Sequence, residues 1–250
     1  MRMRKYLFLM LILISTPALA DDLMVAASAN AQFAMRELRE SFQKDTGISV
    51  TVITGSSGKL TAQIKNGAPF DIFLSADTRY PRVLYDDGFT LGEPVVYAYG
   101  SLVLWTIKDL ELSGGLPALL GDGFKKIAVA NPQTAPYGVE AIKALRYFDL
   151  YDRLEIRLVY GSSISQTSQF ISSGAADAGI TAKSVVLAPE MKTSGSWIDV
   201  PPESYEPIAQ GVVIIKRGKE APKKDAVLFY DFLFSEQAKE IFTKYGYRLP

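Results

Sequence analysis

The 250-residue sequence contains no cysteine and no histidine. Without cysteine, the chain forms no disulfide, offers no thiolate nucleophile and builds no thiolate metal site. Without histidine, Ser-His-Asp catalysis, His-ligated zinc and acid–base catalysis by imidazole are all excluded. Basic residues are not in excess either, since 27 Lys and Arg stand against 27 Asp and Glu. We therefore expect no nucleic-acid partner.

The N-terminal segment has the pattern of a secretory signal peptide. Arg2, Arg4 and Lys5 form a basic region, residues 6–14 are apolar, and Ala18-Leu19-Ala20 matches a cleavage signal. This apolar run is well short of the ~20 residues that a helix needs to span a bilayer. We predict that residues 1–20 are cleaved after Ala20 and that the chain, which has no cysteine for a lipid anchor, is soluble in the periplasm. Removing the three basic residues leaves 24 Lys and Arg against 27 acidic residues, a net charge near −3.

Strand-like segments alternate with helical ones along the rest of the chain, which predicts an α/β fold with mainly parallel sheets flanked by helices. Two extended segments, residues 97–105 and 204–210, suit crossovers between two lobes. We predict lobe 1 from residues 21–100 plus 208–250 and lobe 2 from residues 101–207, with a ligand cleft between them at the carboxyl ends of the strands. A C-terminal helix is expected over residues 224–244, with Val227, Phe234 and Phe242 among its core contacts.

Polar turns precede several of the predicted helices. Gly55-Ser56-Ser57-Gly58 lies between a strand and a helix, where unpaired backbone N–H groups favour an oxyanion. Similar turns occur at residues 28–30, 131–138 and 161–166. Serine is also a favoured helix cap, so these residues have a purely structural interpretation as well.

The ordered set of motifs resembles the periplasmic molybdate- and tungstate-binding proteins of ABC importers. The resemblance covers nearly the whole chain after residue 20 and rests on Ala26-Ala27-Ser28, Gly55-Ser56-Ser57-Gly58, Asn66-Gly67-Ala68-Pro69, Phe73-Leu74-Ser75-Ala76-Asp77, Ala135-Pro136-Tyr137-Gly138, Tyr205-Glu206-Pro207-Ile208 and Tyr245-Gly246-Tyr247. It implies a two-lobed type II periplasmic-binding-protein fold that holds a tetrahedral oxyanion between the lobes by neutral donors alone.

The resemblance also implies ligand residues. The two ligand serines of the family fall on Ser28 and Ser57, a ligand tyrosine of some members falls on Tyr137, and a backbone N–H donor falls on Ile164. Neighbouring positions are secondary candidates: Ala29, Asn30, Ser56 and Ser163. Other members place a ligand tyrosine just after the strand at 176–181, where this chain has Ala182-Lys183-Ser184. We expect Tyr137 to supply that donor instead.

A site built only from donors suits an oxyanion that carries no proton. Molybdate and tungstate satisfy every donor, whereas protonated phosphate would bring a hydrogen with no acceptor. Sulfate has the same charge and shape, so its exclusion has to come from cavity size. Together with this chemistry, the resemblance implies a monomeric, non-enzymatic protein without a cofactor or metal-ion ligands, which binds molybdate and tungstate and delivers them to the permease of an ABC importer.

Two alternatives remain for the same residues, another tetrahedral anion and an acyl-enzyme hydrolase. The ligand could be another tetrahedral anion, such as sulfate or thiosulfate. Carboxylate binders usually use an arginine clamp, and the predicted cleft turns contain no arginine. Ser56-Ser57-Gly58-Lys59 also contains the S-x-x-K pattern of acyl-enzyme hydrolases. A P-loop is excluded, because the glycine spacing before Lys59 is wrong and no Ser or Thr follows it.

Overall fold

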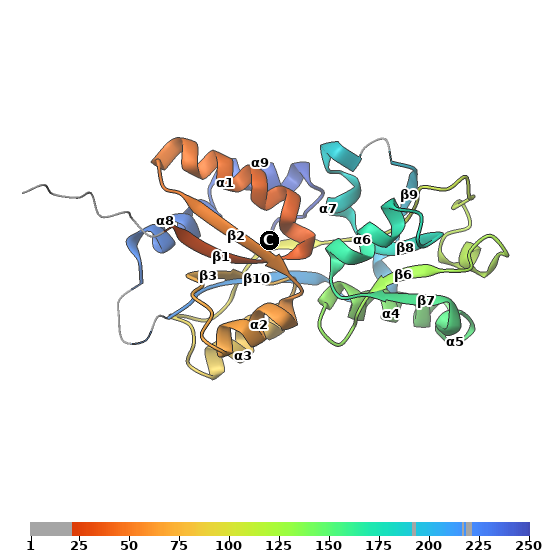
Figure 1. Ribbon diagram of the computed structural model, residues 1–250, viewed down its shortest axis with the longest axis horizontal. Coiled ribbons are helices and arrows are strands. Elements are labelled where there is room, and N and C mark those ends of the chain that lie inside the picture. The colour runs from red at the N-terminus through yellow and green to blue at the C-terminus, as the bar shows by residue number, and fades with distance from the viewer. Residues whose placement is uncertain (1–21, 192–193, 217, 219–221) are drawn as a thin grey trace, which may run out of the picture.

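The computed structural model describes residues 22–191, 194–216, 218 and 222–250. Two five-stranded sheets lie side by side, each with helices packed against it (Figure 1). We call the sheet ordered β2-β1-β3-β10-β4 with its helices lobe 1, and the sheet ordered β7-β6-β8-β5-β9 with its helices lobe 2. The predicted two-lobed α/β fold is thereby confirmed. The predicted signal peptide lies outside the described residues.

In lobe 1, one strand of the sheet opposes the direction of the others. The strands are, in sheet order, β2 (Val50–Gly55), β1 (Leu23–Ser28), β3 (Ile72–Leu74), β10 (Ile208–Ile214) and β4 (Val95–Gly100). The pairs β1·β2 and β1·β3 are parallel, and β10 pairs antiparallel with both of its neighbours. The carboxyl ends of β1, β2 and β3 therefore meet at one edge of the sheet.

Lobe 2 repeats this arrangement. Its strands are, in sheet order, β7 (Leu158–Gly161), β6 (Ile127–Ala130), β8 (Ala178–Ala182), β5 (Leu102–Thr106) and β9 (Ser196–Asp199). The pairs β6·β7 and β6·β8 are parallel, whereas β5 is antiparallel to β8 and β9. The chain crosses between the sheets at β4 to β5 and at β9 to β10. The boundaries predicted for the lobes as separate domains stay a prediction.

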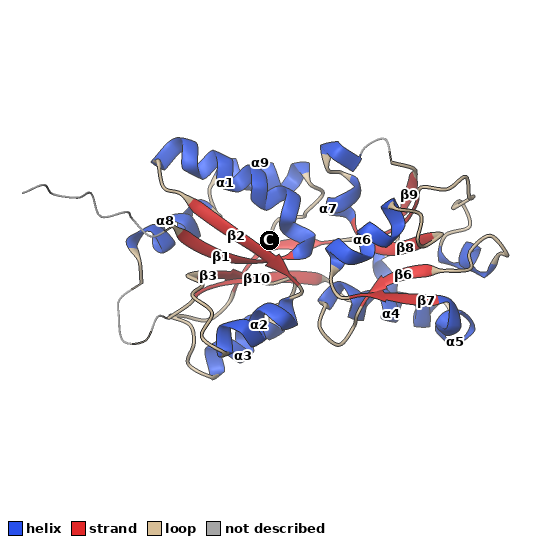
Figure 2. Ribbon diagram, in the orientation of Figure 1, coloured by secondary structure: helices blue, strands red, loops and turns tan. Residues whose placement is uncertain are grey.

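Helices cover both faces of each sheet (Figure 2). Lobe 1 carries α1 (Gln32–Thr46), α8 (Lys224–Phe232) and α9 (Glu236–Lys244) on one face and α2 (Ser57–Lys65) and α3 (Arg79–Asp86) on the other. Lobe 2 carries α6 (Ile164–Ser172) and α7 (Lys183–Val186) on one face and α4 (Pro136–Tyr147) and α5 (Tyr151–Leu154) on the other. Short 3-10 helices occur at Ala29–Ala31, Leu116–Leu120, Glu155–Arg157, Pro189–Met191 and Pro202–Ser204.

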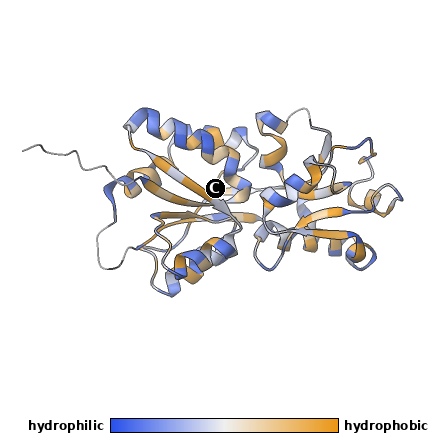
Figure 3. Cartoon of the chain, viewed as in Figure 1, coloured by the Kyte–Doolittle hydropathy of each residue, from blue (hydrophilic) through white to orange (hydrophobic). Residues whose placement is uncertain are grey.

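Strand β1 shows how the sequence fills both faces of its sheet, since successive side chains of a strand point to opposite sides. Val25 and Ala27 pack in the core beneath α1, α8 and α9, whereas Ala26 packs in the core with α2 and α3. Such a doubly covered strand has to be apolar on both sides, as β1 is. Figure 3 shows apolar strands enclosed by helices whose outer faces are hydrophilic.

Two predicted elements differ from those observed. The extended run over residues 97–105 is divided at Ser101 into β4 and β5, which belong to different sheets. The C-terminal helix is two helices, because the Ser235 hydroxyl accepts a hydrogen bond from the Ala238 N–H (3.2 Å) and begins a new helix there. Val227 is 38% exposed and was wrongly predicted as core, because it lies one residue off the buried face of α8 that Ala226 and Phe229 share.

Candidate functional site

The polar turns of lobe 1 meet at the carboxyl edge of its sheet. In the register of the strands, Ser28 at the end of β1 is opposite Gly55 at the end of β2, and Ala27 is opposite Leu74 at the end of β3. The residues that follow these strands are therefore neighbours in space although they are far apart in sequence. Parallel strand order alone brings the Ser28 and Gly-Ser-Ser-Gly turns together.

Ser28 and Ser57 converge on one point. Both are buried, at 2% and 0% exposure, and their hydroxyls are hydrogen-bonded to each other. The backbone N–H of Ala76, just after β3, donates to both hydroxyl oxygens at 3.0 Å. Each oxygen already accepts this bond, and one of the two hydroxyl hydrogens is donated to the other serine, so both hydrogens become available to a ligand only when the bond between the serines breaks. The Ala76 N–H thus orients both serines as donors.

Ser56 is the N-cap residue of α2, but its side chain makes no cap hydrogen bond. Its hydroxyl is buried and has no partner among the described residues. A buried hydroxyl without a partner costs about 1–3 kcal/mol. The position of Ser56 as N-cap of α2 therefore does not account for its buried hydroxyl.

Lobe 2 contributes residues from the first turns of two helices. Tyr137 is the second residue of α4, after Pro136 at a position that proline favours, and its side chain is 2% exposed. Ile164 is the first residue of α6, so its backbone N–H has no acceptor within the helix. Ser163 caps this helix, its hydroxyl accepting from the Gln166 N–H at 3.4 Å.

These residues line one small cavity between the lobes. Its wall is formed by Ser28, Ala29, Asn30, Gly55, Ser56, Ser57, Ala76, Ala135, Pro136, Tyr137 and Ile164. Seven of the eight predicted residues are in this set, and Ser163 is not. Every lining residue is uncharged. The cavity measures about 10 Å³, about the least that holds one water molecule, and the hydroxyls of Ser28 and Ser57 are in contact in its wall.

Asn30 belongs to a buried hydrogen-bond network behind the cavity. Its side-chain N–H₂ group donates to Gln210 Oε1 at 2.8 Å and to the Tyr247 hydroxyl at 3.0 Å. Gln210 Nε2 in turn donates to the Tyr137 hydroxyl at 3.3 Å. Burial raises the pKa of Tyr137 well above its usual value, so the phenol keeps its proton. Asn30 thus directs its two hydrogens to the network, although it lines the cavity.

The two lobes touch each other around the cavity. The Gly58 N–H, next to Ser57, donates to the Thr134 carbonyl of lobe 2 at 2.9 Å. The Ser165 hydroxyl donates to Gln32 Oε1 at 2.7 Å, and Arg36 and Glu190 form an ion pair. These bonds close the two lobes over the cavity.

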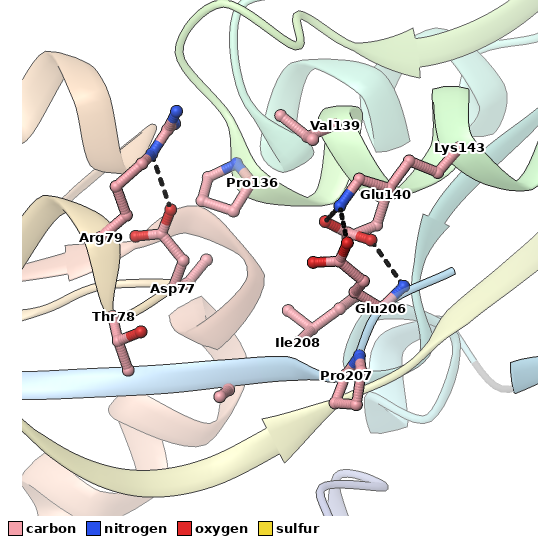
Figure 4. A pocket seen from close by; sticks show the side chains of 12 residues that line it. Asp77, Thr78, Arg79, Pro136, Val139, Glu140, Lys143, Glu206, Pro207 and Ile208 are labelled. Atoms are coloured by element: carbon pink, nitrogen blue, oxygen red, sulfur yellow. Dashed lines mark hydrogen bonds and ion pairs between the residues drawn. The ribbon is translucent and has the colours of Figure 1, made fainter.

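A larger cavity of about 290 Å³ lies next to the small one and shares Ala76 and Pro136 with it (Figure 4). Its wall is charged: Arg79 lies 3.5 Å from Asp77, and Lys143 pairs with Glu140 and Glu206 at 3.0 Å each. Burial raises the pKa of Asp77. Both cations are paired with carboxylates, so this cavity offers no excess positive charge to an anion. The donors instead converge in the smaller cavity.

The S-x-x-K pattern does not form a catalytic pair. Lys59 is exposed, whereas the Ser56 hydroxyl is buried without a partner among the described residues. An activated serine needs its base within hydrogen-bond distance. In the part of the chain that the structure describes, no cluster of acidic residues could hold a metal ion, and no helix combines the length and apolarity needed to cross a membrane.

The sequence did not predict the roles of Ala76 and Gln210, nor the contact of Gly58 with lobe 2. Ala76 acts through its backbone, which leaves no side-chain signal, although it lies in one of the motifs that carried the resemblance. Gln210 is far in sequence from the residues that line the cavity, and its side chain is buried, at 0% exposure. A polar residue in the middle of a strand that pairs on both sides is the signal that could have identified it.

Nearly the whole chain is similar to known solute-binding proteins. Residues 23–248 match the family described as bacterial extracellular solute-binding protein. The chain is 39% identical over 238 residues to the molybdate-binding protein ModA of Azotobacter vinelandii, covering 95% of this chain and 94% of that protein. It is 38% identical over 235 residues to the molybdate-binding protein ModA of Rhodobacter capsulatus, covering 94% and 91% of the two chains.

The fold comparison agrees with the sequence comparison. The solved structure of the periplasmic molybdate-binding protein of Azotobacter vinelandii superimposes with a TM-score of 0.86 at 38% identity. The match covers 92% of this chain and 100% of that one. With the family match extending over both lobes and the cavity between them, the chain belongs to the bacterial extracellular solute-binding proteins.

Proposed function

We propose that this protein binds molybdate, and also tungstate, in the periplasm and delivers the anion to the membrane permease of an ABC importer. The observation that carries the proposal is the convergence of uncharged donors from both lobes on one cavity. Lobe 1 supplies the hydroxyls of Ser28 and Ser57, and lobe 2 supplies the Tyr137 hydroxyl and the Ile164 N–H. The molybdate-binding relatives support the choice of anion.

The donors balance the charge of the ligand without a salt bridge. A hydrogen bond to a charged oxygen is worth about 1.5–3 kcal/mol, so four donors supply about 6–12 kcal/mol before the cost of ordering. Three of the donors lie in the first turns of α2, α4 and α6, where the helix dipoles favour negative charge. The anion has to part the hydroxyls of Ser28 and Ser57, which then exchange their mutual hydrogen bond for bonds to its oxygens.

The secondary positions have narrower roles in this proposal. The Ser56 hydroxyl is the one additional donor whose bond would go to the ligand, because it has no partner among the described residues. Ala29 contributes backbone only, Asn30 acts through the network, and Ser163 caps α6. Tyr137 takes the place of the tyrosine that other family members carry after the strand equivalent to β8.

The rest of the proposal concerns the molecule as a whole. The protein acts as a monomeric binding protein, without enzymatic activity, resident cofactor, metal-ion ligands or a nucleic-acid partner. It reaches the periplasm after cleavage behind Ala20 and carries no lipid anchor. The relatives are binding proteins, which supports the non-enzymatic role.

Isothermal titration calorimetry of the chain from residue 21 with molybdate, tungstate, sulfate and phosphate tests the proposal. We expect tight binding of molybdate and tungstate, and binding of sulfate and phosphate at least about a hundredfold weaker. Sulfate or phosphate binding as tight as molybdate binding would contradict the proposed specificity. Covalent labelling by a fluorescent penicillin would instead support the acyl-enzyme alternative.

A further inference from the structure

Gln210 lies at the centre of the network behind the cavity, on the crossover strand β10. Its side chain is fully buried and has two chemically different ends. The carbonyl oxygen Oε1 accepts from Asn30 Nδ2 at 2.8 Å and from the Tyr97 hydroxyl at 2.9 Å. The amino nitrogen Nε2 lies 3.3 Å from the Tyr137 hydroxyl. The orientation of this amide therefore decides which group Tyr137 meets.

A single backbone carbonyl fixes that orientation. The Asn30 carbonyl can only accept, and the Tyr247 hydroxyl donates its one hydrogen to it at 3.0 Å. The Tyr247 oxygen is then left to accept from the Asn30 side chain at 3.0 Å, so Asn30 turns its N–H₂ end toward Tyr247 and Gln210. Gln210 consequently presents Oε1 to Asn30 and Nε2 to Tyr137. Each hydrogen bond in this series thus determines which group donates and which accepts in the next one.

Tyr137 is the last residue in this series of hydrogen bonds. Among the residues that the structure describes, its hydroxyl accepts from the amide donor Gln210 Nε2 at 3.3 Å, and Asn30 Nδ2, whose two hydrogens go to Gln210 and Tyr247, lies 3.5 Å away. The phenol hydrogen is thus left for the cavity that Tyr137 lines. Gly100 at the end of β4 leaves room for the hydroxyl, since a Cβ there would overlap it. The raised pKa of Tyr137 keeps the hydrogen present.

We infer that Gln210 is a positioning residue: by donating to the Tyr137 oxygen, it leaves the Tyr137 hydroxyl to act as a donor, and not as an acceptor, toward the cavity. Through it, the site selects oxyanions that carry no proton, because a protonated anion finds no acceptor at Tyr137. The inference rests on the proposed role of Tyr137 as an oxyanion ligand. Gln210, which is outside the cavity wall, would thus determine whether Tyr137, which is part of that wall, donates to the ligand.

The Gln210→Glu variant tests the inference, since it replaces the one donating end by an acceptor of the same shape. Donors from Asn30, Tyr97 and Tyr137 surround the new carboxyl group and favour its ionised form. Tyr137 then donates to Glu instead of to the anion. We expect calorimetry to show molybdate binding weakened at least about tenfold in Gln210→Glu and in Tyr137→Phe.

The decisive comparison is the double variant. In the Gln210→Glu background, Tyr137→Phe should cost less than about twofold, because the hydroxyl no longer donates to the ligand. Gln210→Glu and the double variant both carry the new carboxylate, so its charge does not contribute to the difference in affinity between them. Gln43→Glu, at an exposed position of α1, is the matched control and should bind as the wild type does. If Tyr137→Phe costs its full tenfold in both backgrounds, or Gln210→Glu binds normally, the inference is wrong.

A measurement on the wild type keeps the test independent of how the variants fold. In the molybdate-bound protein, nuclear Overhauser effects from the Gln210 side-chain N–H₂ hydrogens should reach the ring of Tyr137 and not that of Tyr97. The opposite pattern would overturn the inference. A wild type that binds no molybdate in calorimetry would instead contradict the proposed function.

Discussion

Gly58 is the residue at which closure of the lobes can be tested most sharply. A Cβ at this position would lie 3.1 Å from Thr134 Cα in lobe 2, and 2.7 Å from the Tyr80 hydroxyl of its own lobe. Tyr80 has a movable side chain, but Thr134 presents backbone, so Gly58→Ala obstructs the closed form. Overpacking of this kind costs about 1–3 kcal/mol, which weakens ligand binding by between about fivefold and about a hundredfold.

The same substitution should not destabilise lobe 1. Gly58 lies in the first turn of α2 and has no positive φ, and alanine is favoured over glycine in helices by up to about 1 kcal/mol. We therefore expect thermal unfolding of the ligand-free variant at the wild-type temperature or above it, together with weaker molybdate binding and faster release in stopped-flow experiments.

Gly92→Ala is the matched control, because a Cβ at Gly92 meets nothing within 4 Å. It should leave both the unfolding temperature and the dissociation constant unchanged. An unchanged molybdate affinity in Gly58→Ala would show that the contact between Gly58 and Thr134 is not part of the binding-competent form, and the reasoning would be refuted.

Further predictions concern the ligand contacts, the lobe interface and the buried phenols. Ser57→Ala should weaken molybdate binding at least about tenfold in calorimetry without unfolding the protein; an unchanged dissociation constant removes Ser57 from the ligand set. The side chains of Arg36 and Glu190 are each 45% exposed, so Arg36→Ala should cost no more than about fivefold in affinity, and nothing at high salt, whereas a larger salt-independent loss would contradict a surface role. Burial raises the pKa of Tyr247 from 10.0 to about 12, so the unfolded chain releases this proton first. Stability in urea should be retained below pH 10 and fall as the pH rises toward 12, less steeply in Tyr247→Phe; a wild type whose stability is constant over this range would contradict the buried, protonated phenol.

The fold was largely predictable, because alternation of apolar strands with amphipathic helices is a local pattern. The differences in the strand and helix boundaries had separate causes. Residues 97–105 suit an extended strand on both sides of Gly100-Ser101, and only the tertiary structure shows that the two halves belong to different sheets. The break at Ser235 depends on a serine cap within a sequence that otherwise suits one long helix.

The candidate site was predictable to the extent that its side chains carry polar signals in turns. Ser28, Ser57 and Tyr137 follow strands or begin helices, and parallel sheets gather such positions at one edge. The role of Ala76 was not predictable, because any residue has a backbone N–H. The role of Gln210 was not predicted from the sequence, because its effect on Tyr137 depends on the orientation of two side-chain amides, which only the three-dimensional network fixes.

The most direct test of the central claim is a crystal structure of the protein with molybdate, in which anomalous scattering locates the molybdenum atom. We expect one site between the lobes, with oxygens within hydrogen-bond distance of the hydroxyls of Ser28, Ser57 and Tyr137 and of the Ile164 N–H. A molybdenum atom in the charged cavity beside Arg79 and Lys143, or no ordered molybdenum between the lobes, would contradict a binding site built from uncharged donors.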